Sequence, residues 1–104
     1  MQNTKLSEWK FLGETKGNTK LTLPDSFSEL SVYVYLSTNI AICMHIIAAE
    51  LSSVGKVFRS GYFGTNSITG MTSVLSSLTE IYVNMAYFNE TNILNTATLK
   101  IYYR

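Results

Sequence analysis

The feature that most constrains the fold is a strict alternation of side chains at positions 30–37. Leu30, Val32, Val34 and Leu36 occupy every second position, and serine or tyrosine fills the positions between them. Because successive side chains of a β-strand point to opposite faces, this pattern places all four aliphatic residues on one face. The segment therefore predicts a strand with one buried face.

The same alternation returns in two later segments, 80–87 and 98–104. The residues predicted to face a core there are Ile81, Val83, Met85 and Tyr87 in the first segment and Leu99, Ile101 and Tyr103 in the second. Shorter segments rich in β-branched and aromatic residues suit a pleated, half-buried surface and predict further strands. These shorter candidates are 9–12, 19–23, 57–63 and 68–75.

Residues that tolerate turn dihedrals separate the candidate strands. They are Gly17-Asn18, Pro24-Asp25, Ser37-Thr38-Asn39, Gly55, Gly64-Thr65-Asn66 and Asn89-Glu90-Thr91-Asn92. Short strands at this spacing indicate a sandwich or a barrel, and we expect an all-β fold: a single antiparallel β-sandwich of seven or eight short strands. A chain of 104 residues has room for one such domain, spanning 1–104, since domains cluster near about 100–150 residues.

The segment 40–51 fits two different structures. Its length suits a helix, and its last four residues, Ala48-Ala49-Glu50-Leu51, are good helix formers. Its alternation and its β-branched residues favour a strand, which we expect. Just before the first clear strand, Ser26-Phe27-Ser28-Glu29 fits a helix-capping box. Because strand-like alternation starts at Leu30, we expect at most one short 3₁₀ turn there.

Composition narrows the classes of partner. Apolar residues make up 46% and charged residues 14% of the chain, which excludes a disordered tail. A net charge of +1 is too small to attract a polyanion, so we expect no nucleic-acid partner. The longest nearly unbroken apolar run, 40–49, is half the roughly 20 residues that a bilayer requires, so we expect no membrane insertion. The first ten residues have no apolar run typical of a signal peptide.

Four segments taken in order resemble small C-terminal modules of tail-fibre and baseplate-type proteins from phages and prophages of Gram-positive and gut bacteria. They are Trp9-Lys10-Phe11-Leu12-Gly13, then Thr22 to Leu30, then Phe58-Arg59-Ser60-Gly61-Tyr62-Phe63, and finally Thr98 to Arg104. The resemblance implies an antiparallel β-sandwich at the tip of a fibre, commonly a homotrimer, that attaches to the host surface. It implies no catalytic residue and no cofactor, and it places the protein in the virion, made in the host cytoplasm without a signal peptide.

Catalytic and metal sites are poorly supported by the residues present. Cys43 and His45 would share a strand face, but a cysteine nucleophile also needs an orienting group and a shaped site. A structural zinc site needs about four ligands, and the chain has one Cys and one His. A glycosidase would need two carboxylates facing each other across a cleft, and the seven acidic residues lie mostly near turns or on polar strand faces. We expect no enzyme and no metal site.

Two groups of residues are candidates for binding. Tyr33, Tyr35, Tyr82 and Tyr102 lie opposite the aliphatic faces, and adjacent strands would gather them into one patch suited to sugars or proteins. The alternative for this patch is a solvated face or the seam of a trimer. The candidate ligand-binding residues are Arg59, Tyr62, Phe63 and Asn66, which fall around a turn at Gly64. Their alternative role is structural: Arg59 would bond to a local carboxylate or carbonyl, and the aromatic rings would close the edge of the core.

The sequence thus predicts a non-catalytic attachment module for a host surface polysaccharide or protein, assembled as a homotrimer. The first alternative is a purely structural module that trimerises a fibre or decorates a capsid. The second is a small intracellular phage protein that inhibits a host factor. Asn89-Glu90-Thr91 fits the acceptor sequence for N-glycosylation. Since no signal peptide is visible, we interpret it as a hairpin turn.

Overall fold

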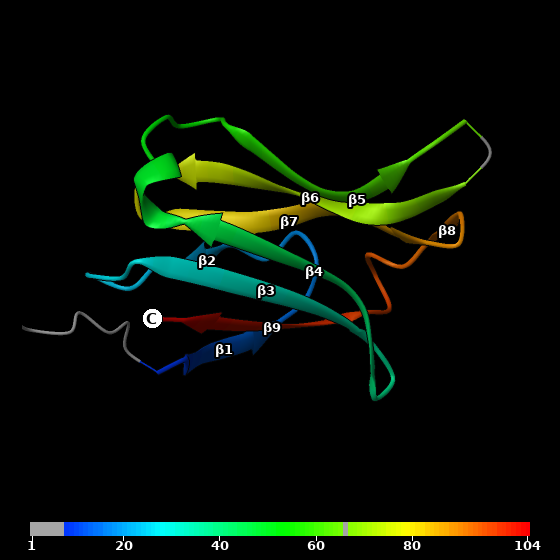
Figure 1. Ribbon diagram of the computed structural model, residues 1–104, viewed down its shortest axis with the longest axis horizontal. Coiled ribbons are helices and arrows are strands. Elements are labelled where there is room, and N and C mark those ends of the chain that lie inside the picture. The colour runs from blue at the N-terminus through cyan, green and yellow to red at the C-terminus, as the bar shows by residue number, and fades with distance from the viewer. Residues whose placement is uncertain (1–7, 66) are drawn as a thin grey trace, which may run out of the picture.

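The computed structural model describes residues 8–65 and 67–104 (Figure 1). This part of the chain contains nine β-strands and one short 3₁₀ helix. In chain order they are β1 (Lys10–Thr15), β2 (Leu21–Thr22), β3 (Glu29–Leu36), β4 (Asn39–Ile47), η1 (Ala48–Glu50), β5 (Val57–Phe63), β6 (Ile68–Ser77), β7 (Glu80–Phe88), β8 (Thr91–Asn92) and β9 (Thr98–Tyr103).

The strands form two antiparallel sheets that face each other, so the predicted β-sandwich is confirmed (Figure 1). Sheet A has the strand order β1-β9-β3-β4, and β9 lies between the first and third strands of the chain. Sheet B has the order β2-β7-β6-β5, and β8 extends it beside β7. The chain passes from sheet A to sheet B through η1, which lies at the left end of the view in Figure 1.

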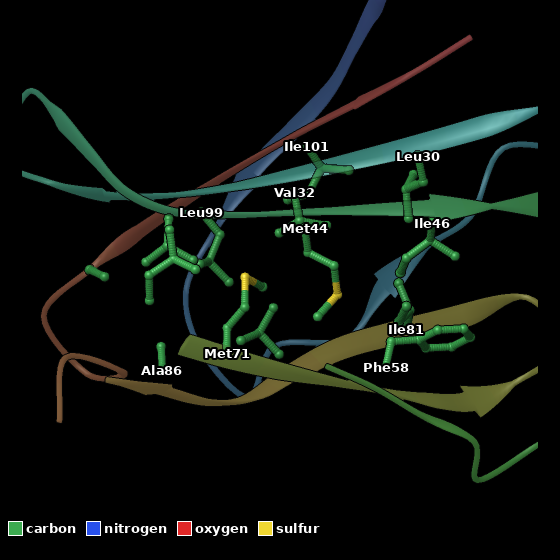
Figure 2. Close-up of a cluster of buried hydrophobic side chains, with 14 of the residues drawn as sticks. Leu30, Val32, Met44, Ile46, Phe58, Met71, Ile81, Ala86, Leu99 and Ile101 are labelled. Carbon is green, nitrogen blue, oxygen red and sulfur yellow. The ribbon is translucent and has the colours of Figure 1, made fainter. Parts of the chain in front are cut away.

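The core fills the space between the two sheets, and the alternation in β3 and β9 confirms its predicted faces. Figure 2 shows Leu30, Val32, Leu99 and Ile101 of sheet A directed toward side chains of sheet B such as Met71. These five residues are all buried. Each fully buried aliphatic side chain contributes about 1.5–3 kcal/mol relative to an exposed one, so the shared inward face is what holds the sheets together.

The register shifts at several points in the two sheets, and the shift in β7 changes which side chains face the core. In β7 the partners of Thr72 and Ser73 are Met85 and Val83, so Asn84 is an extra residue, a β-bulge. The bulge reverses the faces beyond it: Ala86 is fully buried, and Met85 is only partly buried. The prediction that Met85 and Tyr87 continue the inward face of Ile81 was therefore wrong. The side chain of Asn84 accepts a hydrogen bond from the Thr72 hydroxyl at 2.6 Å.

The two ambiguous segments are now assigned. Positions 39–47 form the strand β4, as expected, with Ile42, Met44 and Ile46 buried; only 48–50 turn into the helix η1. Positions 26–28 form bends without a helix. The backbone N–H groups of Ser28 and Glu29 donate to the Arg104 carbonyl, which draws this segment into the sheet beside β9.

The two sheets approach each other most closely along β4 and β5, which are the edge strands on one side of the sandwich. The Ser60 hydroxyl donates a 2.7 Å hydrogen bond to the Cys43 carbonyl and links the two edges directly. Inside the core, a small cavity of about 10 Å³ lies beside Ser73, whose buried hydroxyl has no hydrogen-bond partner within residues 8–65 and 67–104. A cavity of this size holds about one water molecule and no larger ligand.

Candidate functional site

The outer face of sheet A carries a cluster of aromatic side chains around a hollow of about 290 Å³. Its lining residues are Trp9, Tyr33, Tyr35 and Tyr102, and we call it the aromatic hollow. The alternation that sends Leu30, Val32 and Val34 into the core necessarily sends the tyrosines of β3 outward. Because β9 pairs with β3, Tyr102 is brought to the same face.

The aromatic rings at the centre of the hollow pack against one another. The rings of Tyr33 and Tyr102 meet edge to face, with centroids 5.6 Å apart and planes at 76°. On the other side of Tyr102, Phe11 packs at 5.4 Å with a tilt of 57°. Edge-to-face and offset aromatic pairs are each worth about 0.5–1.5 kcal/mol beyond their buried area. The strand register puts Phe11 and Ser31 on either side of Tyr102, so small Ser31 leaves room beside the ring.

Trp9 forms the end of the hollow, just before β1, and it is held by charged residues. The Arg104 guanidinium lies 4.4 Å from the indole centroid, and the His45 ring meets the indole edge to face at 6.0 Å. Both of these partners are themselves fixed by Glu29. One carboxylate oxygen of Glu29 pairs with the Arg104 Nε, and the other lies 3.3 Å from the His45 Nε2. Trp9 is thereby positioned while 38% of its surface stays exposed.

The opposite end of the hollow, at Tyr35, is bounded by a lysine. The Lys100 Nζ lies 4.8 Å from the centroid of the Tyr35 ring. A cation over an aromatic face is attracted by the ring quadrupole, so the two side chains hold each other in place. Four aromatic side chains, three of them with a hydroxyl, line the hollow, and a lysine packs on one of them. This combination suits binding of a polar ligand with flat apolar faces.

Cys43 and His45 are the pair that the sequence offers as a cysteine nucleophile and its base. Cys43 and His45 share the exposed outer face of β4, but within the described residues no hydrogen bond joins them, and His45 contacts Glu29 instead. Glu29 itself is engaged by Arg104 as well. In the part of the chain that the structure describes, no group of three or more His, Cys, Asp or Glu side chains is placed to hold a metal ion.

Of the ligand-binding residues predicted around Gly64, Arg59, Tyr62 and Phe63 lie on β5 of sheet B. Arg59 lies over the Phe63 ring at 4.9 Å, so the structure brings these two together. Tyr62 is 66% exposed, and its ring lies against Gly64 of the turn. Asn66 lies outside the described residues. The contact of Arg59 is with an aromatic ring and not with the carboxylate or carbonyl of the structural alternative, and the role of these residues in binding stays a prediction.

The aromatic hollow was predicted in part. Three of its four rings belong to the tyrosine patch expected from alternation, whereas Tyr82 lies on β7 in the other sheet. Trp9 was missed as a site residue, as were Arg104 and Glu29, which position it. The available signal was weak: a single tryptophan beside a strand, with partners that are distant in sequence.

A second hollow, of about 250 Å³, lies at the end of the sandwich where η1 is found. Leu23, Phe27 and Leu51 contribute apolar surface to it, and Asp25 is its one charged lining residue. It has one aromatic ring among its lining residues, against four in the aromatic hollow. The aromatic hollow is therefore the better candidate for a binding site.

Comparison of the chain with protein-family models, with curated proteins and with solved structures finds no match. Among the described residues, no helix has the length and apolar character needed to cross a membrane.

Proposed function

We propose that this chain is a non-catalytic attachment module of a phage tail fibre or related virion structure, and that it binds a glycan of the host surface through the aromatic hollow. The resemblance to tail-fibre modules supports the attachment role. The hollow supports a sugar ligand, because a sugar ring has an apolar face that stacks on aromatic rings and hydroxyl groups that bond to polar neighbours.

The observation that carries the proposal is the convergence of four aromatic rings from three separate segments around one hollow: Trp9 before β1, the tyrosines of β3, and Tyr102 of β9. Their rings are fixed by packing and by an ion pair rather than left free in solvent. A site that is already ordered loses less conformational entropy on binding, which increases affinity. At about 290 Å³ the hollow is near the lower end of ligand pockets, which span about 300–1,000 Å³, and suits a short stretch of a polysaccharide.

We expect Trp9→Ala to weaken glycan binding by about tenfold, because losing one stacked aromatic ring removes about 0.5–1.5 kcal/mol beyond its buried area. The measurement is saturation binding of the labelled protein to an array of bacterial surface polysaccharides. Trp9 is partly exposed and lies outside the core, so the variant is expected to fold.

The matched control is Tyr62→Ala, which removes a more exposed aromatic ring from sheet B. It is expected to leave binding unchanged. If Tyr62→Ala weakens binding and Trp9→Ala does not, the site lies at the turn after β5 and the aromatic hollow is not the site. An array that shows no saturable binding contradicts the attachment proposal.

A second proposal concerns assembly as a homotrimer, which would raise avidity through effective concentration without new contacts at each site. Its supporting observation is three exposed apolar side chains on the edge strands β4 and β5. Ile47 is 48% exposed, Ile40 53% and Val57 53%. A contact between copies of the chain along these edge strands would bury apolar surface that is now exposed.

Ile47→Lys is expected to convert a trimer to a single chain of 11.7 kDa, because it places a charge in a contact that apolar residues would otherwise bury. Light scattering coupled to size exclusion measures the mass of the wild type and the variant. Tyr62→Lys, at an exposed position near the other end of β5, serves as the control and is expected to keep the trimer. A wild-type protein that stays monomeric at all concentrations contradicts the trimer.

A further inference from the structure

Charge is distributed unevenly along the aromatic hollow. At the Trp9 end, the positive charge of Arg104 is compensated by Glu29, which also contacts His45. Within residues 8–65 and 67–104, Arg104 is the one lysine or arginine that forms an ion pair with a carboxylate. At the Trp9 end the hollow therefore presents the indole surface, and the positive charge of Arg104 beside it is already paired with Glu29.

The Tyr35 end carries two lysines instead. Lys100 lies over the Tyr35 ring, with its Nζ 4.8 Å from the centroid. Lys16 donates a 3.1 Å hydrogen bond to the hydroxyl of Thr98, which is the direct cross-strand partner of Tyr35. Lys100 is thus held by the Tyr35 ring itself, and Lys16 by the hydroxyl of the residue that pairs with Tyr35.

The nearest acidic residue by register is Glu14, the cross-strand partner of Lys100 on β1. No ion pair joins Glu14, or any other carboxylate of the described residues, to Lys16 or Lys100. Two cations without an ion-pair partner, one over Tyr35 and one beside the residue that pairs with it, are a favourable location for a negative group at this end of the hollow.

We infer that the glycan taken by the aromatic hollow is anionic, with its acidic group at the Tyr35 end between Lys16 and Lys100 and its sugar rings over Tyr33, Tyr102 and Trp9. This inference rests on the proposed function. Lysine ammonium groups are compact charges on flexible side chains, so they bind a carboxylate or a phosphate on the sugar equally well. The shared chemistry is a sugar that carries a fixed negative charge.

The test measures binding of the full chain to immobilised oligosaccharides in matched pairs: uronic-acid chains with their methyl esters, and phosphorylated glucans with the same glucans after dephosphorylation. We expect the acidic member of at least one pair to bind about tenfold more tightly than its neutral form, since hydrogen bonds to charged groups are the stronger ones. Its affinity is expected to fall as salt rises, because the cations are solvent-accessible. The pair that shows the preference distinguishes a carboxylate from a phosphate.

Lys100→Gln and Lys16→Gln are each expected to remove most of the preference for the acidic member, so that the ratio of the two affinities falls toward one. Lys100→Arg keeps the positive charge and is expected to keep the preference for the acidic member. That result would show that Lys100→Gln acts through the lost charge and not through lost packing on the Tyr35 ring. The matched control is Lys56→Gln, because Lys56 also lies over an aromatic ring, Phe58 at 5.2 Å, but on sheet B. It is expected to bind both members like the wild type.

Two outcomes separate this inference from the proposal on which it rests. Equal binding of acidic and neutral members, still weakened by Trp9→Ala, overturns the acidic preference and leaves glycan attachment standing. No binding to any member by a folded wild-type protein overturns both. A preference that survives in Lys100→Gln and in Lys16→Gln places the acidic group elsewhere and also overturns the inference.

Discussion

Leu99→Asp is expected to abolish soluble folding. Leu99 lies in the middle of sheet A with 2% of its surface exposed, and its backbone is flanked by Thr15 of β1 and Val34 of β3. An aspartate there would be a buried charge without a partner, which costs about 3–5 kcal/mol. Since small domains are stable by only about 5–15 kcal/mol, this one change removes most or all of the stability. The measurement is the soluble yield, followed by thermal unfolding of whatever folds.

The control for Leu99→Asp is Lys100→Asp, the same substitution one position along β9. Successive side chains point to opposite faces, and Lys100 lies on the outer face over Tyr35. It is expected to fold, with a loss of about 1 kcal/mol or less from the cation–ring contact. If the two variants unfold at the same temperature as the wild type, the inward face assigned to β9 is wrong.

Gly61→Ala is expected to lower the free energy of unfolding by about 2–4 kcal/mol, the sum of backbone strain and overpacking. Gly61 lies in β5 with a φ of +108°, which side-chain-bearing residues rarely adopt. A Cβ at this position would lie 2.3 Å from the Thr69 carbonyl oxygen on the paired strand β6, and backbone cannot easily give way. Urea unfolding followed by circular dichroism measures the change through the midpoint.

Gly13→Ala provides the comparison. Gly13 also lies in an edge strand, β1, beside a register shift, but a Cβ there meets nothing within 4 Å. Removing a glycine whose native conformation alanine can adopt stabilises a protein by about 0.4–1 kcal/mol, because the unfolded chain loses freedom. The two substitutions are therefore expected to shift the midpoint in opposite directions. A similar loss in both would mean that the close approach of β5 to β6 has no special cost.

The faces of the strands were predictable wherever alternation is unbroken. In β3 and β9 each inward residue was identified from period two alone, because burial on one face requires it. The failure in β7 has a local cause: Asn84 is inserted as a bulge, and one extra residue exchanges the two faces for Met85 and Ala86. Alternation carries no mark of a bulge, so the reversal could be recognised only once β6 was placed beside β7.

The candidate site was predictable only as far as it lies within single strands. Tyr33 and Tyr35 share a face by alternation, so their association follows from the sequence. The association of Glu29 with Arg104 joins residues 75 positions apart and depends on strand order, which alternation does not specify. Strand order also places Tyr82 in the opposite sheet, away from the other tyrosines.

The position of β9 in sheet A also determines when the aromatic hollow forms during folding. β9 lies between β1 and β3, so sheet A is incomplete until strands from the two ends of the described chain have paired. Pairing over such sequence separations is slow, and all-β domains dominated by it fold in about milliseconds to seconds. Until then Tyr102 is absent from the hollow, and Trp9 lacks the Arg104 on which it rests. The aromatic hollow is therefore complete only when β9 has paired with both β1 and β3.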